Sequence, residues 1–383
     1  MRVQELFEGK GSLAHLGKLA EEQSWKKLFV VTDKNSWTLS GAEKIIVPLF
    51  PPESLFFFDS FDPNPKLEDA LRGIDYFLEV NPDVIIAAGG GSAIDMAKLI
   101  NGLSSDRNNM SDYVTGKKKL EKKAVPLVAV PTTAGTGSEA THFAVVYMDK
   151  VKYSLADKLL KPSFVILDPG LVMSVPPYIT ACTLMDALCQ AMESLWSVNS
   201  TEESDKYAEE AVKLILDNSP AENGLSVETR KNHQKAAYLA GKAIDITKTT
   251  AAHALSYYLT SYHNIPHGHA VGLMFGWVFA QNCGVNEDNC NDGRGEERVR
   301  KRLAFIRKLF SASDTEDFIN KFYVFMEKIG LKTDAVDFSE QTALKLLKSV
   351  NAERLGNNPV SIDLSEKTAG PFAAFFRRLN IQR

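Results

Sequence analysis

Most of the histidines in this chain fall within one short segment. Residues 253–272 read HALSYYLTSYHNIPHGHAVG and contain His253, His263, His267 and His269, four of the seven histidines present. Imidazole is a common ligand of transition metals, and its pKa lets it exchange protons near neutral pH. The segment therefore indicates either a metal site or acid–base chemistry.

A single straight helix could not bring these imidazoles together. At a rise of about 1.5 Å per residue, His253 and His267 would lie roughly 20 Å apart. Pro266 lacks a backbone donor, and SYHNIP is typical of a turn with Asn264 as a plausible cap. We therefore expect one helix to end near Tyr262 and the next to begin near Pro266, so that His253 and His267 face each other.

A second segment, TLMDALCQAMES at 183–194, offers further ligands. An ionised Asp186 in so apolar a stretch is costly unless it is paired or binds a metal. Gln190 follows four residues later, on the same helical face. The chain thus offers a candidate site for a divalent cation with two oxygen and two nitrogen ligands: Asp186, Gln190, His253 and His267. A buried hydrogen-bonded network without a metal would use the same side chains.

Two glycine-rich loops each follow an apolar run that predicts a strand. They are GGGSAIDMAK at 89–98 and PTTAGTGSEAT at 131–141. Glycines let a phosphate approach the backbone, and a helix N-terminus attracts the anion. A tight turn between strand and helix is the alternative for the first loop. Two such loops on one sheet favour a long ligand such as a dinucleotide.

The choice of dinucleotide depends on Asp33, which ends the predicted strand KLFVVTD at 27–33. A carboxylate there could accept hydrogen bonds from ribose hydroxyls and would repel a 2′-phosphate, which favours NAD over NADP. Asp33 could equally be a helix cap.

The elements that must position these residues change character near residue 176. Before it, apolar runs alternate with helical patterns such as 65–80, which predicts a parallel sheet with ligands at the carboxyl ends of its strands. After it, the pattern is almost entirely helical. We therefore predict an α/β dinucleotide-binding domain over 1–175 and an all-α domain that binds metal and substrate over 176–383.

Composition excludes several other classes of protein. The net charge of -4 provides no basic field for nucleic acid or an anionic membrane. The N-terminal segment does not resemble a signal peptide, and no apolar stretch approaches the ~20 residues that span a bilayer. The four cysteines form no CxxC pair, so a reducing cytoplasm is the expected location.

The segments GGGSAIDMAK, PTTAGTGSEAT, DALCQAMES and HALSYYL…IPHGHAV resemble, in this order, the signature segments of iron-containing (group III) alcohol dehydrogenases. The resemblance covers most of the chain and weakens after about residue 280. It implies an α/β domain followed by a helical domain, an architecture similar to that of dehydroquinate synthase. It also implies NAD, with NADP possible, a divalent Fe²⁺ or Zn²⁺, and a homo-oligomer such as a dimer.

The family's functional residues carry over by position. The resemblance implies metal ligands at Asp186, His253 and His267, and a cofactor site formed by Gly89, Gly90, Gly91, Ser92, Asp95, Lys98, Thr132, Thr133 and Ser138. Gln190 replaces the usual histidine, and its neutral carbonyl is a poorer ligand for these metals. Tyr257 stands where many members have a further histidine near the substrate. His269 is expected near the substrate, and His263 is expected to be an ordinary turn residue.

Within the family, the segment 245–271, DITKTTAAHALSYYLTSYHNIPHGHAV, and the segment SLWSVNSTEES resemble the phosphonoacetaldehyde reductase (hydroxyethylphosphonate dehydrogenase) branch. A phosphonate would need cationic or hydroxyl partners. Such groups occur at Lys152, Lys248, Thr249 and Thr250, although a solvated surface charge is the ordinary role of a lysine.

These patterns together predict a metal-assisted, NAD(P)-dependent enzyme that interconverts a small aldehyde and its primary alcohol. The expected catalytic residues are His267, His269 and Tyr257. Two other classes remain as alternatives. One is a dehydroquinate synthase-like lyase, and the other is a nucleotide-binding relative that has lost its metal through Gln190.

Overall fold

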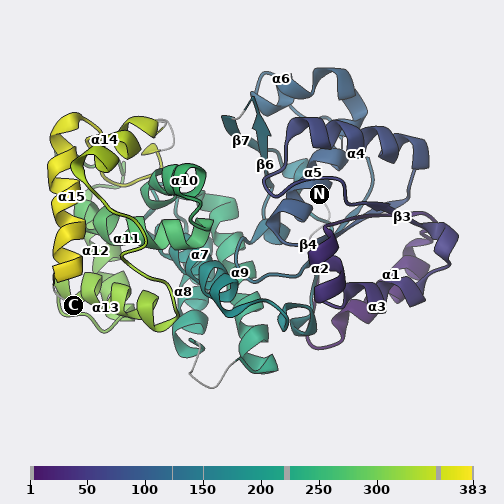
Figure 1. Cartoon of the computed structure of the whole chain (residues 1–383), viewed down its shortest axis with the longest axis horizontal. Coiled ribbons are helices and arrows are strands. Elements are labelled where there is room, and N and C mark those ends of the chain that lie inside the picture. The colour runs from purple at the N-terminus through teal and green to yellow at the C-terminus, as the bar shows by residue number, and fades with distance from the viewer. Residues whose placement is uncertain (1–3, 123, 150, 220–224, 351–354, 382–383) are drawn as a thin grey trace. The chain divides into compact units, whose positions relative to one another are not determined.

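The structure is a computed structural model that describes residues 4–122, 124–149, 151–219, 225–350 and 355–381. The chain divides into two compact units (Figure 1). Unit 1 comprises Met1–Val175 and Ala221–Gly241, and unit 2 comprises Pro176–Pro220 and Lys242–Arg383. None of the helices in the described residues is both long enough and apolar enough to cross a bilayer.

A parallel sheet forms the centre of unit 1, as predicted. In the described residues it has six strands in the order β1-β8-β5-β4-β2-β3, and every pairing is parallel. The strands are β1 (Glu5–Glu8), β2 (Leu28–Thr32), β3 (Leu55–Phe58), β4 (Val84–Gly89), β5 (Leu127–Pro131) and β8 (Phe164–Leu167). Strands β6 (Phe143–Met148) and β7 (Val151–Ala156) form a separate antiparallel pair.

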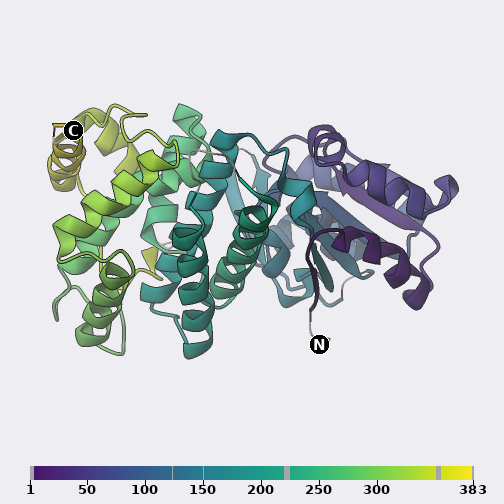
Figure 2. The same cartoon turned by 90° about the horizontal axis from the view of Figure 1, so that it is seen from below.

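Helices cover both faces of this sheet, which is why its central strands are continuous apolar runs. Alternate residues of β2 and β4 face opposite sides, with Phe29 and Ile85 in one core and Val30 and Ile86 in the other. Figures 1 and 2 show the strands as one layer between helices. The helices of this part are α1 (His15–Gln23), α2 (Lys34–Leu39), α3 (Ala42–Ile46), α4 (Leu67–Val80), α5 (Gly91–Leu103) and α6 (Met110–Val114).

The strand order reverses between β2 and β4. From β2 the chain passes first to β3 on one side and then to β4 on the other. In an open parallel sheet, ligands bind outside the carboxyl ends of the strands at such a switch point. Asp33 follows β2, and Gly90 follows β4.

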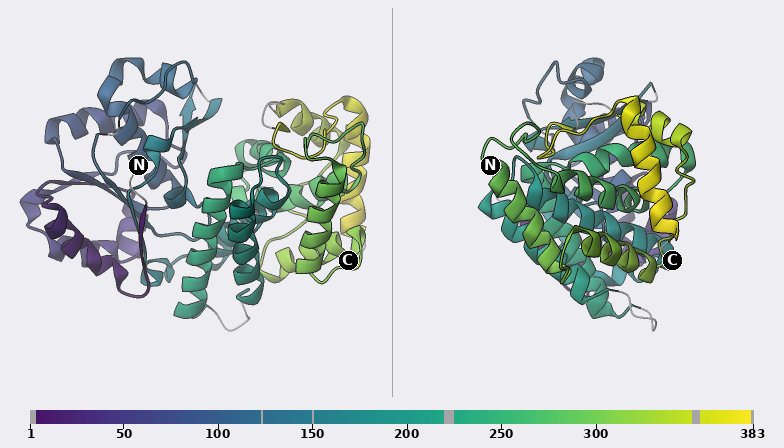
Figure 3. Two further views of the ribbon diagram at one scale, coloured as in Figure 1. Left: turned by 180° about the vertical axis from the view of Figure 1, so that it is seen from behind. Right: turned by 90° about the vertical axis from the view of Figure 1, so that its left-hand side faces the viewer.

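Unit 2 is helical in the described residues, and with the sheet of unit 1 this confirms the predicted fold class. Two of its helices, α7 and α11, are buried along most of their length and form its centre. Figure 3 shows α15 on the outside of this unit. The helices are α7 (Pro177–Trp196), α8 (Glu202–Asp217), α10 (Ala251–His263), α11 (His267–Cys283), α12 (Glu296–Leu309), α13 (Thr315–Lys328), α14 (Glu340–Ser349) and α15 (Glu366–Ile381).

The long helix α9 (Val227–Thr247) contributes to both units. In its first part, the Tyr238 hydroxyl donates a hydrogen bond to Gln4 at 2.9 Å, and Gly241 packs directly on Gly137. These contacts group residues up to Gly241 with unit 1. The sequence pattern of α9 is helical, like that of the other segments after residue 176. The sequence therefore does not indicate that the first part of α9 belongs with unit 1.

Short 3-10 helices complete the described structure. They are η1 (Ser12–Ala14), η2 (Val47–Leu49), η3 (Pro52–Ser54), η4 (Ser104–Asn109), η5 (Ser138–Ala140), η6 (Lys158–Leu160) and η7 (Pro169–Val172).

Candidate metal and dinucleotide sites

The histidine segment is broken as the sequence predicts. Helix α10 ends at Asn264, which has the left-handed conformation (φ 53, ψ 28), and α11 begins at His267 after Pro266. The rings of His253 and His267 lie 5.4 Å apart, centroid to centroid. The break therefore brings together two side chains that a continuous helix would separate.

Asp186 on α7 completes a three-residue cluster. Each of Asp186, His253 and His267 offers one ligand atom, and these three atoms lie within 4.8 Å of one another. Among the described residues, this is the group of histidine, cysteine or acidic side chains that could hold a metal ion. The Nε2 atom of His253 is 3.2 Å from Oδ1 of Asp186. Asp186 and His253 are 4% and 3% exposed. One carboxylate and two imidazoles are a donor set that suits Fe²⁺ or Zn²⁺.

Gln190 lies beside this cluster. It is buried one turn after Asp186, and its side chain hydrogen-bonds that carboxylate. A half-turn of its amide would exchange the nitrogen and the oxygen, two atoms that are distinguished only by their hydrogen bonds. Gln190 is therefore positioned to contribute a carbonyl oxygen.

Glu193 is a site residue that the sequence analysis missed. Its carboxylate is fully buried and accepts hydrogen bonds from the Thr250 hydroxyl at 2.6 Å, the Ala252 backbone nitrogen at 2.8 Å and Nδ1 of His253. The available signal was its position seven residues after Asp186, which places both carboxylates on one face of α7.

The charges of the cluster support one another. Burial alone would lower the pKa of His253, but Glu193 and Asp186 raise it to about 10. Burial alone would raise the pKa of Asp186, but its hydrogen bond to His253 and the nearby His267 hold it below its usual value. Without a cation, a proton on His253 balances the carboxylates. A divalent cation would take over that balancing charge.

A glycine allows α11 to approach α7 at the cluster. A Cβ atom on Gly268 would collide with the Cys182 carbonyl and would lie 2.9 Å from the Asp186 Cβ. Four residues later, a Cβ atom on Gly272 would lie 2.8 Å from the Met185 side chain. The lack of side chains at these positions lets the first turn of α11, with His267, pack against Asp186.

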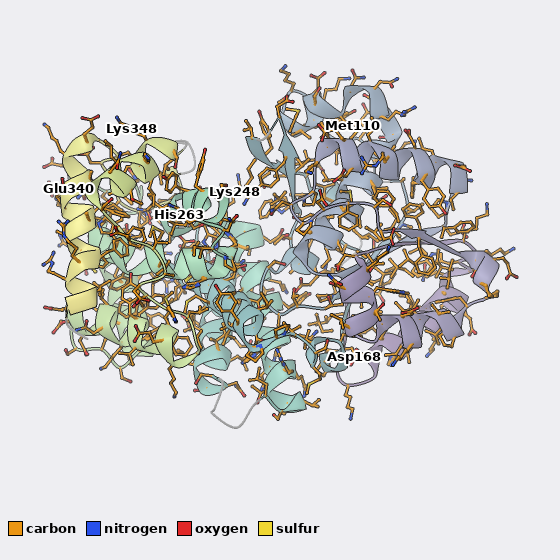
Figure 4. The ribbon with its side chains drawn as sticks, viewed as in Figure 1. Met110, Asp168, Lys248, His263, Glu340 and Lys348 are labelled. Carbon is orange, nitrogen blue, oxygen red and sulfur yellow. The ribbon has the colours of Figure 1, made fainter. Side chains whose placement is uncertain are left out.

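Tyr257 and His263 occupy different surroundings. The ring of Tyr257 stacks on that of His267, with centroids 5.7 Å apart and planes 6° from parallel. His263 is exposed at the end of α10, and Lys248 is exposed just after α9 (Figure 4). Tyr257 thus adjoins the cluster.

His269 is 3% exposed, and both of its ring nitrogens are engaged. Its Nδ1 atom lies 3.0 Å from the Tyr178 hydroxyl, and its Nε2 atom lies 2.8 Å from the Lys332 carbonyl. Because a carbonyl only accepts, Nε2 carries the proton and Nδ1 accepts from Tyr178. Burial also lowers the pKa of His269. Any proton exchange with His269 would therefore pass through Tyr178.

In unit 1, the two glycine-rich loops meet at one edge of the sheet. Gly89 and Pro131 are paired where β4 and β5 end, and Thr32 and Ala88 are paired where β2 ends. The carboxyl ends of parallel strands share an edge, so Asp33 and both loops lie together.

The first loop leaves space beside one glycine only. A Cβ atom on Gly89 would lie 2.6 Å from the Ala93 Cβ, and one on Gly91 would lie 2.9 Å from Thr136. A Cβ atom on Gly90 would make ordinary contact with Thr133 at 3.6 Å. Gly89 and Gly91 are thus required by packing, whereas Gly90 precedes the helix start at which an anion would bind.

Asp33 is a helix cap and also faces the first loop. Its Oδ1 accepts a hydrogen bond from the Ser36 backbone nitrogen at 2.9 Å, which caps α2. Its Oδ2 is 3.5 Å from the Cβ position of Gly89. One oxygen is therefore used by α2, and the other is directed toward the loop.

Other residues expected at the cofactor site hold the second loop in place. The fully buried Lys98 donates hydrogen bonds to the carbonyls of Ser138 at 2.6 Å, Thr141 at 2.9 Å and Phe143 at 2.6 Å. Asp95 accepts a hydrogen bond from the Ser138 hydroxyl at 2.5 Å. These contacts fix the backbone of the second loop.

Ser92 and the threonines lie on the two loops themselves. The Ser92 hydroxyl accepts a hydrogen bond from the Asn64 backbone nitrogen at 3.3 Å. Thr132 is buried, whereas Thr133 is half-buried beside Gly90. Ser92, Thr133 and Thr136 are hydroxyl residues beside the glycines that the structure leaves partly accessible.

Comparison with known proteins agrees with this fold and these sites. Residues 4–169 match the profile described as "Iron-containing alcohol dehydrogenase", and residues 180–363 match "Fe-containing alcohol dehydrogenase family, C-terminal". The chain belongs to the iron-containing alcohol dehydrogenase family, and it is an enzyme of the alcohol dehydrogenase type.

Individual relatives cover most of the chain. Long-chain-alcohol dehydrogenase 1 of Geobacillus thermodenitrificans is 33% identical over 70% of each chain. A 1-propanol dehydrogenase of Salmonella typhimurium is 34% identical over 73% of this chain and 72% of its own. The crystal structure of sulfoacetaldehyde reductase from Bifidobacterium kashiwanohense, in complex with NAD⁺, superimposes with a TM-score of 0.85 at 28% identity, over 98% of this chain and 97% of that one.

Proposed function

We propose that this protein is a metal-assisted, NAD(P)-dependent oxidoreductase that interconverts a small anionic aldehyde and its primary alcohol, with phosphonoacetaldehyde and 2-hydroxyethylphosphonate as the substrate pair. The observation that carries the proposal is the cluster of buried Asp186 and His253 with half-buried His267, whose ligand atoms converge within 4.8 Å. Gln190 is the proposed fourth ligand, or leaves that position to water.

Each set of residues has a defined task. A divalent cation held by the cluster supplies Lewis acidity toward a carbonyl oxygen, and the nicotinamide cofactor supplies the hydride. The loop at Gly90 and the N-terminus of α5 bind the pyrophosphate, and the free oxygen of Asp33 accepts from a ribose hydroxyl. That carboxylate favours NAD over NADP, because it repels a 2′-phosphate.

Proton delivery is assigned to groups beside the cluster. Tyr257 stacks on His267 and contributes a hydroxyl. The Tyr178 hydroxyl is hydrogen-bonded to His269, and the Tyr178 side chain is 43% exposed. Tyr178 is the member of this pair that can exchange a proton with its surroundings, and the hydrogen bond from its hydroxyl to Nδ1 orients that hydroxyl.

Two likenesses support the anionic substrate. The segment 245–271 resembles the phosphonoacetaldehyde reductase branch, and the similar crystal structure is that of a sulfoacetaldehyde reductase. Sulfoacetaldehyde is a two-carbon aldehyde that carries a sulfonate, and sulfonate and phosphonate groups are recognised by the same kinds of cationic and hydroxyl partners. Lys248 and Thr249, next to the start of α10, are the proposed partners.

The test is an aldehyde panel assayed by oxidation of NADH and NADPH. Phosphonoacetaldehyde, sulfoacetaldehyde, propanal and acetaldehyde are compared with and without added Fe²⁺ or Zn²⁺. We expect kcat/KM to be highest with phosphonoacetaldehyde and NADH, and to depend on the metal. Equal turnover of propanal and phosphonoacetaldehyde would remove the anionic substrate, and turnover that chelation leaves unchanged would remove the role of the metal.

We propose in addition that the protein works as a homodimer in a reducing cytoplasm. The four cysteines are unpaired, which agrees with that location. The family resemblance alone supports the dimer, which light scattering of the purified protein would test.

A further inference from the structure

We infer that Glu193 is the positioning residue that prepares His253 to bind the metal. This inference rests on the proposed function, since it concerns the same cluster. Glu193 does not touch the cluster's centre but lies behind His253, on the side of Nδ1. It stands two helical turns after Asp186 on α7, so one helix supplies both a ligand and the support of another ligand.

The hydrogen bonds of Glu193 determine which nitrogen of His253 is available. An ionised carboxylate accepts hydrogen bonds and donates none, so Nδ1 of His253 must carry the proton that Glu193 binds. The lone pair that can bind a metal is then on Nε2, which is the nitrogen directed to Asp186 at 3.2 Å. Hydrogen bonding of the distal nitrogen to a carboxylate also makes imidazole a stronger ligand.

Glu193 also holds the backbone that carries His253. Thr250 precedes the first residue of α10 but makes no side-chain cap of its own helix. Instead Glu193 Oε1 accepts from the Ala252 backbone nitrogen, and the Thr250 hydroxyl donates to the same oxygen. The Trp196 indole in turn donates to Thr250 at 2.8 Å. A buried carboxylate at the positive end of α10 thus replaces the usual cap and fixes both the ring and the main chain of His253.

This arrangement bears on the neutral amide at Gln190. With a glutamine in place of a charged or imidazole ligand, the cluster has one fewer strong donor. Glu193 adds a second carboxylate within one hydrogen bond of the ligands. Two carboxylates and two neutral imidazoles carry the charge that balances a divalent cation. Glu193 therefore contributes to the charge that balances the cation without being a ligand itself.

The test is a titration with Co²⁺, followed by its visible absorption, on the full chain stripped of metal. Glu193→Gln keeps the size of the side chain but presents a donor or a weaker acceptor to Nδ1. We expect it to weaken Co²⁺ binding by about 10- to 100-fold. In a His253→Ala background the same change should add no further loss, because the ligand it supports is gone.

Thr250→Val is the matched control, because it removes a hydrogen bond from the other oxygen of the same carboxylate. It should lower the melting temperature of the metal-free protein while Co²⁺ affinity changes by less than in Glu193→Gln.

Equal losses of Co²⁺ affinity in Thr250→Val and Glu193→Gln would overturn the inference. It would also be overturned if Glu193→Gln caused the same loss in the wild-type and His253→Ala backgrounds. A wild type that binds no Co²⁺, Zn²⁺ or Fe²⁺ would overturn the metal-assisted function itself. Binding by wild type that Glu193→Gln leaves unchanged would overturn only the role of Glu193.

Discussion

The backbone nitrogen of Thr132 donates a hydrogen bond to the carbonyl of Gly89 at 3.0 Å. This bond joins the last residue of β4 to the residue that follows β5, so the two glycine-rich loops start from linked positions. Two loops that begin at Gly89 and Pro131, 42 positions apart in the sequence, thereby form one surface at the edge of the sheet. The two loops should therefore act as one binding element.

Gly90→Val should weaken NADH binding by at least about tenfold, or about 1.4 kcal/mol, while the fold survives. The position tolerates a Cβ atom, whose nearest neighbour would be Thr133 at 3.6 Å. The added methyl groups would instead occupy the space of a pyrophosphate. NADH affinity is measured by fluorescence titration and stability by melting temperature. Gly91→Ala is the contrasting variant, because its Cβ would lie 2.9 Å from Thr136 and should cost stability. Unchanged affinity in folded Gly90→Val would remove this loop from the cofactor site.

Asp33→Ser should improve the use of NADPH relative to NADH without loss of stability. Serine can still cap α2 through the Ser36 nitrogen, while the charge that faces Gly89 disappears. Asp33→Ala removes both the charge and the cap, and it should be less stable by about 1 kcal/mol. The ratio of kcat/KM for the two cofactors, measured in all three proteins, separates the two roles. A wild type that already prefers NADPH would contradict the assignment.

Gln190→His should increase the metal content of the purified protein, because imidazole is a better ligand than an amide carbonyl for Fe²⁺ and Zn²⁺. His267→Ala should abolish aldehyde reduction, because the cluster loses a ligand. Metal analysis beside turnover, for wild type and both variants, is the measurement. The expectation fails if wild type stripped of metal by a chelator turns over as fast as the metal-loaded enzyme. It also fails if Gln190→His retains no more metal than wild type.

Gly268→Ala should destabilise the protein by about 1–3 kcal/mol and reduce metal affinity. Its methyl group would collide with the Cys182 carbonyl, which would push the first turn of α11 and His267 away from Asp186. Gly293→Ala is the control, since a Cβ atom there meets nothing within 4 Å. Urea unfolding and Co²⁺ titration measure the two effects. Equal behaviour of the two variants would show that α7 and α11 need no glycine at their contact.

Stability should fall with rising pH through the titration of Glu139. Burial raises the pKa of Glu139 from 4.5 to about 7, although the Lys98 ammonium acts in the opposite direction and Asp95 adds to the rise. Because the folded-state pKa is higher, the folded protein binds more protons between these values, and stability declines as pH rises from about 4.5 to about 7. Each pKa unit corresponds to about 1.4 kcal/mol.

Glu139→Gln removes this titration but keeps the side-chain size and leaves Asp95 and Lys98 in place. Its melting temperature should therefore fall less than that of wild type between about pH 5 and pH 8. Parallel pH profiles for the two proteins would mean that Glu139 is ionised in the folded state throughout this range.

Sequence pattern alone predicted the parallel sheet, the helical second half and the break between α10 and α11. These features follow from local physics, since continuous apolar runs, helical spacing and a proline act within a few residues. The same pattern identified Asp186, His253 and His267 as one cluster, because a charge in an apolar helix and two histidines on either side of a turn are unusual enough to be noticed in sequence.

Tertiary structure decided the rest, because it depends on packing between residues far apart in the chain. The role of Glu193 depends on the packing of the start of α10 against α7, where its carboxylate meets Thr250, Ala252 and His253. In the sequence alone, a glutamate near the end of a helix does not stand out. The sequence predicts His269 near the substrate, but only the fold shows that Tyr178 and the Lys332 carbonyl occupy its two ring nitrogens. Local sequence sets which groups are present, but only the packed fold sets which hydrogen bonds each buried group must make.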